Sequence, residues 1–291
     1  MYQILKKYKL TSLHLMVVIL GLTGVFGKMI SLEAIHLVWY RMGIACISLM
    51  VFLIFTKQLK SFSKKNFFEL LAVGGLVTIH WLCFFESIKV STVSIAVVCM
   101  ATSSLFSAII EPLFFKRKLL PYEIIMSIIV LIALIFVMGA ETKYIMGYFY
   151  GIIAALFGTL FTLFNAKYIK KVGAAQITMI EMLSGVLIIS AILIYQQDYM
   201  VFTSLLSLND FYYLAILAIL CTAMVFVWMT EIMRHITPFS LIMAINLEPI
   251  YSILLALLIF GDDELMSISF YIGSCIIIGV VFLEGYLKNK Q

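Results

Sequence analysis

The sequence predicts an all-α integral membrane protein, in which ten transmembrane helices form two inverted five-helix repeats around a central cavity. Three features lead to this prediction: the composition, the lengths of the apolar runs and an internal repeat. Of the 291 residues, 64% are hydrophobic and 12% are charged, whereas about 25% of the residues of a soluble domain are charged. A chain with so little polar surface cannot coat a water-soluble globule, which excludes soluble, disordered and collagen-like proteins.

The apolar runs have the length of membrane-spanning helices. A bilayer core of about 30 Å requires about 20 consecutive apolar residues in a helix. The first run has no cleavage site at its end, so we expect an uncleaved first span. In all, the chain contains ten such runs, near residues 10–30, 35–55, 66–88, 92–115, 121–140, 145–166, 174–195, 210–233, 238–260 and 267–287.

Ten spans place both termini on the same side of the membrane, and the basic residues indicate which side this is. Cytoplasmic loops carry an excess of lysine and arginine. Only Lys28, Lys89 and Lys143 fall on the side away from the termini, while Arg41 lies inside span 2. The side of the termini carries the remaining sixteen, which are Lys6, Lys7, Lys9, Lys57, Lys60, Lys64, Lys65, Lys116, Arg117, Lys118, Lys167, Lys170, Lys171, Arg234, Lys288 and Lys290. We therefore expect both termini in the cytoplasm.

The second half of the chain repeats the first. A shift of 145 residues places Glu86 on Glu231 and aligns the five spans of residues 10–140 with those of residues 145–288. Because five is an odd number, the second copy must be inverted relative to the first. Inverted repeats are typical of secondary transporters, in which two related halves rock about a site near the middle of the membrane.

Each half contains a short hairpin followed by a long helix, with the sequences FFESIKVSTVSIAVVCMATSSLFSAIIEP and TEIMRHITPFSLIMAINLEPIYSILLALLIFGDDEL. In these segments, and over almost its whole length, the chain resembles the EamA-type permeases of the drug/metabolite transporter superfamily. Pro249 and Gly261-Asp262 match the mid-helix proline and the Gly-acidic ending of that family. The first half departs from this pattern, with Ser104 and Lys116-Arg117 at these places.

The resemblance implies two five-helix repeats, residues 1–143 and 144–291, in a permease that exports amino acids, other small metabolites or toxic compounds. We predict a secondary transporter that exports a small metabolite by alternating access, with an amino acid or a related amphiphilic compound as the candidate substrate. Spans 1–4 and 6–9 are expected to line the cavity, and spans 5 and 10 to brace it from outside. One alternative is an exchanger of phosphorylated or nucleotide-linked metabolites, which requires paired basic residues at depth. Another is a non-transporting membrane subunit.

Span 9 supplies the strongest candidate for substrate binding. An ionisable side chain at the centre of a membrane helix costs about 2.5–3.5 kcal/mol, so it is expected to face protein or water. Glu248 lies near the middle of the span, before Pro249, which removes a helical N–H and allows a kink. Its carboxylate could bind a cationic group, carry a proton or serve as a structural hydrogen-bond partner. Asn246 lies about 160° around the helix from Glu248, so we expect only one of them to face the cavity.

Span 4, the repeat partner of span 9, carries Ser104, Ser107 and Glu111 on one helical face. We expect the two serines to line the cavity and to contact substrate. Glu111 precedes Pro112 and lies within two turns of the basic residues 116–118. It is therefore a candidate for gating or proton coupling, with an interfacial ion pair as the alternative.

Four more candidate binding residues, His80, Trp81, Thr162 and Asn165, lie on spans 3 and 6. Histidine titrates near neutral pH and can relay protons, and tryptophan offers a flat face and one N–H donor. A lone histidine inside a protein is more often a packing residue, so this alternative stays open for His80.

The remaining charged residues are candidates for gating or coupling. Arg41 could clamp a substrate carboxylate through its planar fork, extend to the lipid headgroups, or pair with Glu33 or Glu86 in an outer gate. Glu181 lies on span 7, toward the inner side. Glu86 and Glu231 are repeat mates near opposite membrane faces, which makes them either gate residues or interfacial residues.

No sequence motif indicates enzymatic chemistry or a bound cofactor. The chain has no P-loop, no HExxH motif and no nucleophile elbow, and its five cysteines and four histidines show no metal-ligand spacing. We therefore expect no catalytic residues, no metal and no cofactor. The expected partners are a small-molecule substrate, the lipid bilayer and, as a candidate coupling ion, protons, but no nucleic acid. A monomer or homodimer in the inner (plasma) membrane is expected.

Overall fold

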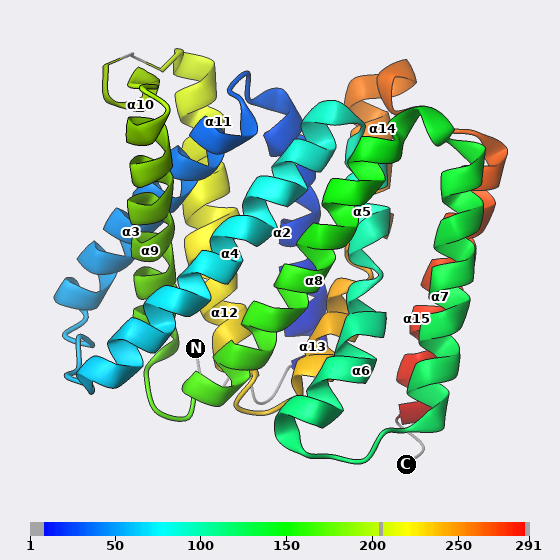
Figure 1. Ribbon diagram of the computed structural model, residues 1–291, viewed down its shortest axis with the longest axis horizontal. Helices are drawn as coiled ribbons and strands as arrows, with labels where there is room; N and C mark the ends of the chain where they lie inside the picture. The colour runs from blue at the N-terminus through cyan, green and yellow to red at the C-terminus, as the bar shows by residue number, and fades with distance from the viewer. Residues whose placement is uncertain (1–8, 204–205, 289–291) are drawn as a thin grey trace.

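The computed structural model describes residues 9–203 and 206–288. The secondary structure within these two ranges is helical (Figure 1). In chain order the α-helices are α2 (Lys9–Met29), α3 (Ala34–Phe55), α4 (Lys64–Val90), α5 (Val93–Met100), α6 (Ser103–Phe115), α7 (Pro121–Ala140), α8 (Ile145–Tyr168), α9 (Ala174–Tyr195), α10 (Met200–Thr203), α11 (Leu208–Ala218), α12 (Val225–Ile232), α13 (Pro238–Ile245), α14 (Glu248–Phe260) and α15 (Ile268–Lys288). Three short elements join them: η1 (Thr142–Tyr144), the π-helix η2 (Ile219–Met224) and η3 (Gly261–Glu264).

Eight helical segments in these two ranges are long and apolar enough to cross a membrane, and two further apolar helices, Leu13–Met29 and Ile268–Val280, are shorter. Each of the eight long segments overlaps one of the predicted spans, and the two shorter helices overlap the first and the last of them. The protein is therefore an α-helical, multi-pass membrane protein. Of the basic residues that predict its orientation, Lys6, Lys7 and Lys290 lie outside the described residues.

Successive spans run in opposite directions through the bundle (Figure 1). The connections that follow α3, α6, α8 and α12 lie at the end drawn at the bottom of Figure 1. They carry most of the basic residues, and we call this end the basic side. The connections that follow α2, α4, α7, α9 and α14 lie at the other end, which we call the opposite side. The charge distribution predicts that the basic side faces the cytoplasm.

Helix α4 packs along both α8 and α9. Small residues let the backbones of membrane helices approach closely, and Gly74 of α4 is such a residue. A Cβ atom at Gly74 would lie 2.5 Å from the Cβ of Ser184 and 2.8 Å from the carbonyl oxygen of Glu181, both on α9. The crossing of α4 and α9 therefore requires glycine at this position.

Gly74→Ala is expected to destabilise the protein, because the added Cβ would meet the backbone of α9 and overpacking typically costs about 1–3 kcal/mol. Gly75→Ala is the matched control on the same helix, since its Cβ would contact only the Cδ1 of Ile188, at 3.5 Å. The measurement is the midpoint of heat-induced unfolding of the purified protein in detergent. We expect a lower midpoint for Gly74→Ala alone; equal midpoints for the two variants would contradict the close crossing.

The fourth and ninth predicted spans are each broken in the middle, where the sequence predicts continuous helices. One break is at Ala101 and Thr102, between α5 and α6, and the other is at Asn246 and Leu247, between α13 and α14. The repeat shift of 145 residues carries the first break onto the second. The two halves are therefore interrupted at the same place.

Different residues produce the two breaks. Pro249 lies in the first turn of α14, where its missing N–H leaves no helical bond unmade, so it begins a helix rather than kinking one. The first half has no proline at this place. There the hydroxyl of Thr102 donates to the carbonyl of Cys99 at 2.7 Å, and that of Ser104 donates to the carbonyl of Ala101 at 2.9 Å. These bonds satisfy carbonyl groups that the end of α5 leaves free.

The eighth predicted span is also irregular, because the π-helix η2 separates α11 from α12. Thr222 lies in η2, and its hydroxyl donates to the carbonyl of Leu217, five residues earlier, at 2.7 Å. Single π-helical turns in α-helices are frequent at functional sites. This turn places Thr222 beside Arg41 of α3.

Candidate functional site

A cavity lies at the centre of the bundle, where the two helix breaks meet α2, α3, α4, α8 and α12. The cavity has a volume of about 70 Å³. This is less than the volume of about 150 Å³ of the cavity that holds benzene in an engineered protein. Its lining residues are Leu20, Thr23, Arg41, His80, Trp81, Phe84, Met100, Ser103, Gly158, Phe161, Thr162, Phe226, Met229, Ile242, Ile245, Asn246 and Glu248. Helices α7 and α15 contribute none of these residues, as predicted for spans 5 and 10. Helix α9 also contributes none, so the expectation for span 7 is wrong.

The repeat shift of 145 residues relates several lining residues of the two halves. The pairs are Trp81 with Phe226, Phe84 with Met229, Met100 with Ile245, and Ser103 with Glu248. Ser103 and Glu248 are the first residues of α6 and α14, the second segments of the two broken spans. The cavity is therefore symmetric in position but asymmetric in chemistry, because one half supplies a hydroxyl group where the other supplies a carboxylate.

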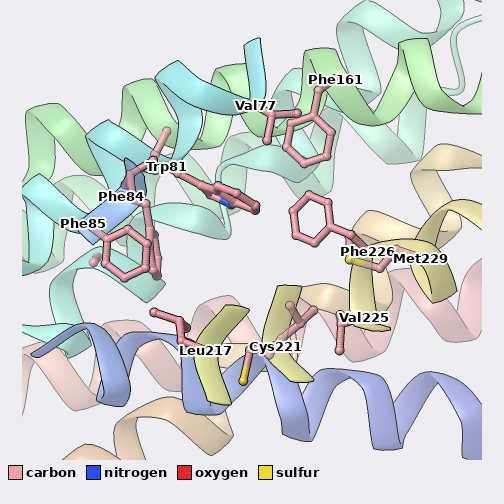
Figure 2. Packing of buried hydrophobic residues seen from close by; sticks show 14 of the residues in the cluster. Val77, Trp81, Phe84, Phe85, Phe161, Leu217, Cys221, Val225, Phe226 and Met229 are labelled. Carbon is pink, nitrogen blue, oxygen red and sulfur yellow. The ribbon is translucent and has the colours of Figure 1, made fainter. Parts of the chain in front are cut away.

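One wall of the cavity is aromatic. The rings of Trp81 and Phe226 make an edge contact with their centroids 4.9 Å apart, and Phe161 stacks on Phe226 at 5.8 Å. Figure 2 shows these three rings turned toward one another. Such rings provide a large apolar surface for the hydrocarbon part of a ligand.

Arg41 is the basic residue of the cavity and is 1% exposed. Its guanidinium carbon lies 3.9 Å from the centroid of the Trp81 ring, and its Nε donates to the hydroxyl of Thr222 at 2.6 Å. Within the described ranges, its Nη1 has no hydrogen-bond partner. Of the predicted alternatives for Arg41, extension to the headgroups and pairing with Glu33 or Glu86 are wrong, because Thr222 and Trp81 hold the side chain inside the bundle.

Glu248 and Asn246 both line the cavity, although the sequence predicts that only one of them faces it. That prediction assumes a continuous helix, and the break at Asn246 and Leu247 removes the assumed 160° relation. Glu248 is 7% exposed, and Asn246 is 3% exposed with no hydrogen-bond partner for its Nδ2 in the part of the chain that is described. Glu248 lies at the N-terminus of α14, where the helix dipole favours a carboxylate. Its charge attracts that of Arg41 across the cavity.

His80 and Thr162 line the cavity and are tied to helix α8. The Nδ1 of His80 lies 2.7 Å from the carbonyl oxygen of Ala154. A carbonyl oxygen only accepts, so Nδ1 carries the proton and the neutral ring keeps Nε2 as an acceptor. The hydroxyl of Thr162 donates to the carbonyl of Gly158 at 2.8 Å. His80 therefore has the structural hydrogen bond of a packing residue and also contributes to the cavity wall.

Three residues predicted to bind substrate do not line the cavity. The hydroxyl of Ser104 bonds to the helix break, and its neighbour Ser103 takes the lining position. The hydroxyl of Ser107 lies 3.5 Å from a carboxylate oxygen of Glu111. Asn165 is 1% exposed and interacts with Glu181.

Arg41 lines the cavity, whereas the other residues predicted to gate or couple transport lie outside it at separate places. Glu181 is fully buried outside the cavity, beside the side chain of Asn165. Glu86 is half-buried, and Glu231 forms an ion pair with Arg234 at 2.9 Å. Glu111 binds residues of the basic side that are described below.

Several lining residues were not predicted, although the internal repeat of 145 residues points to some of them. Shifting the predicted residues Trp81 and Glu248 by 145 positions leads to Phe226 and Ser103. Thr222 has no such signal, because its contact with Arg41 depends on the π-helix. In the described part of the chain, no group of three or more His, Cys, Asp or Glu residues is arranged to hold a metal ion.

Comparisons with known proteins agree with this architecture. The sequence model of the EamA-like transporter family matches residues 9–139 and again residues 145–284. A solved structure, described only as "Crystal structure of protein", superposes with a TM-score of 0.70 over 95% of this chain and 96% of its own, at 13% identity. At that identity the likeness shows the fold alone. A search of curated protein sequences gave no match.

Proposed function

Because the chain belongs to the EamA-like transporter family, we propose that it is a secondary transporter that exports a small zwitterionic metabolite, such as an amino acid, by alternating access. The proposal includes ten spans in two inverted repeats, residues 1–143 and 144–291, with both termini in the cytoplasm and the protein in the inner (plasma) membrane. The repeat of the helix breaks and the paired lining residues support two pseudo-symmetric halves around one cavity.

One observation carries the substrate proposal: Arg41 and Glu248 place opposite charges in one cavity without forming an ion pair within the described chain. Buried charges without partners are costly. A ligand that carries a carboxylate and an ammonium group neutralises both. The unpaired Nη1 of Arg41 faces the carboxylate of this ligand, and Glu248 accepts from its ammonium group.

The other walls of the cavity fit the remaining groups of such a ligand. The free Nδ2 of Asn246 is a second donor for the ligand carboxylate, beside Arg41. The hydrocarbon part of the ligand packs against Trp81 and Phe226, whose rings form the aromatic wall. Since only about 70 Å³ is open to water, binding requires these rings to move apart.

The same charges argue against an exchanger of phosphorylated or nucleotide-linked metabolites. A phosphate group calls for several basic groups, and Arg41 is the basic residue among the lining residues, with the carboxylate of Glu248 opposite it. Glu248 would repel a dianion at the same depth. A non-transporting subunit would not require two charged side chains that form no ion pair in a central cavity.

Coupling to protons is a separate part of the proposal. Glu248 is the first candidate carrier, because it is a buried carboxylic acid that lines the cavity. The buried carboxylate of Glu181 is the second. The hydrogen bond from Nδ1 of His80 makes that side chain a weaker candidate.

Untargeted mass spectrometry of the medium tests the proposed function. Cells that express the protein are compared with cells that carry an empty vector and with cells that express Glu248→Gln at the same membrane level. We expect compounds enriched by the wild type alone, and we expect them to carry both an amino and a carboxyl group. Enriched compounds without an amino group, or with a phosphate group, would contradict the proposed substrate class.

A further inference from the structure

Glu264 was not among the predicted functional residues, and it lies in η3 on the opposite side of the bundle. Its side chain is fully buried. The carboxylate accepts from the backbone N–H groups of Val93 and Ser94 at 2.9 and 3.1 Å, and from the hydroxyl of Ser94 at 2.9 Å. Lys28, at the end of α2, completes the cluster with its Nζ 2.9 Å from Oε1. Since Val93 begins α5, Glu264 binds the free N–H groups at that helix N-terminus.

A second cluster of the same kind lies on the basic side. Glu111, near the end of α6, is 3% exposed. Its Oε2 accepts from the backbone N–H of Phe239, in the first turn of α13, at 2.7 Å. Its Oε1 accepts from Nε of Arg117 at 3.2 Å, and Arg117 also forms an ion pair with Glu123 at 2.9 Å.

The two clusters are reciprocal. Glu111 lies near the end of α6, in the broken span of the first repeat, and binds the N-terminus of the broken span of the second. Glu264 follows α13 and α14 and binds the N-terminus of the broken span of the first. Each cluster joins the two halves of the protein at one side of the bundle (Figure 1). We name them the basic-side latch (Glu111, Arg117, Phe239) and the opposite-side latch (Glu264, Lys28, Val93, Ser94).

The chain turns at equivalent positions to form the two latches. The residues that directly follow α6 and α14 are Lys116 and Gly261, which the repeat shift relates, and both have a φ of 54°. Positive φ is the left-handed region, which glycine adopts at no steric cost. The turn after Lys116 supplies Arg117, and the turn after Gly261 supplies Glu264. The carboxylates themselves do not align, because the shift carries Glu111 onto Ala256, so sequence comparison of the halves cannot find the pair.

We propose that these latches are the two gates of the transport cycle, and this inference rests on the proposed function. The central cavity lies between them along the broken spans, so access from either side requires the N-terminus of one broken span to part from the end of the other. Both latches are closed in this structure, because the hydrogen bonds and ion pairs that form them are all made. Opening one side exposes its carboxylate and the helix N–H groups to water, which replaces the lost bonds, while the other latch holds its side shut.

Cysteine labelling tests this proposal without a known substrate. Thr23→Cys places a thiol in the cavity of a variant from which the five native cysteines have been removed. A membrane-impermeant maleimide is added either to intact cells or to inside-out vesicles. Glu264→Gln is expected to increase the rate of labelling from the opposite side roughly tenfold, because an amide cannot replace a carboxylate that accepts several N–H bonds. Glu111→Gln is expected to do the same from the basic side.

Each latch variant serves as the control for the other, and Asp263→Asn is the matched control for Glu264→Gln, because Asp263 is the exposed neighbouring acid. Size-exclusion chromatography identifies a variant that fails to fold, and Lys28→Gln then provides a milder change in the same latch. An equal increase in the labelling rate from both sides, or no change in either variant, would contradict the assignment of the two latches as gates. If the labelling rate increases on one side only but the protein transports no metabolite, the latches are gates and the proposed transport function is wrong.

Discussion

Arg41→Gln is expected to reduce transport of a zwitterionic substrate by at least roughly 30-fold. Removing one partner of a buried, hydrogen-bonded charge pair costs about 2–5 kcal/mol, and each 1.4 kcal/mol is about a factor of ten. The loss has two sources in this cavity. The substrate carboxylate loses the donor at Nη1, and the carboxylate of Glu248 loses the nearby positive charge that attracts it. The measurement is the initial rate of transport in proteoliposomes that contain equal amounts of protein.

Two further variants distinguish a direct role of Arg41 from a loss of structure. Arg41→Lys keeps the charge but loses the planar fork that stacks on Trp81 and bonds to Thr222, so we expect a partial loss. Thr222→Val removes the hydroxyl at 2.6 Å from Nε and leaves the guanidinium in place, so we expect a loss of roughly tenfold. Full activity of Arg41→Gln, or equal loss in all three variants with reduced protein stability, would contradict a direct role.

Glu248→Gln is expected to cause a loss of similar size that depends on the charge of the substrate. Glutamine has nearly the same shape but cannot neutralise an ammonium group. Transport of the zwitterion should fall by roughly 30-fold or more. A deaminated analogue has no ammonium group, so the variant should carry it at least as well as the wild type does.

The same variant tests proton coupling, because glutamine does not titrate. In a coupled carrier, we expect Glu248→Gln to abolish the effect of an imposed pH gradient on the remaining transport. Glu86→Gln is the control, since this half-buried carboxylate lies outside the cavity. An unchanged response of Glu248→Gln to the gradient would exclude Glu248 as the coupling residue and leave Glu181 as the next candidate.

The sequence predicts the positions of the long apolar helices well, because membrane helices have a characteristic length and each apolar run marks one helix. It also predicts Glu248, His80 and Trp81 as cavity residues, because a polar or amphipathic side chain in the middle of a membrane span is expected to face protein or water instead of lipid. The family confirms the resemblance that the hairpins and Pro249 indicate.

The features that the sequence does not predict depend on contacts between distant segments. Arg41 is near the start of its span, and its depth in the bundle becomes clear only with Thr222 and Trp81 beside it. The break at Ala101 and Thr102 has no proline or glycine to mark it. Glu264 lies in a connection, where acidic residues are ordinary, so only its contacts with Val93 and Ser94 distinguish it.

Ligand-induced stabilisation of the purified protein tests the central claim most directly, because it reports binding whatever the direction or coupling of transport. A ligand that binds the folded state raises the unfolding temperature. The panel is the exported zwitterion with its deaminated and decarboxylated analogues, which for leucine are 4-methylpentanoate and 3-methylbutylamine. We expect the zwitterion to stabilise the wild type most, the acid to stabilise Glu248→Gln, and the amine to stabilise Arg41→Gln. The same order of ligands in all three proteins would contradict a cavity that binds both charges.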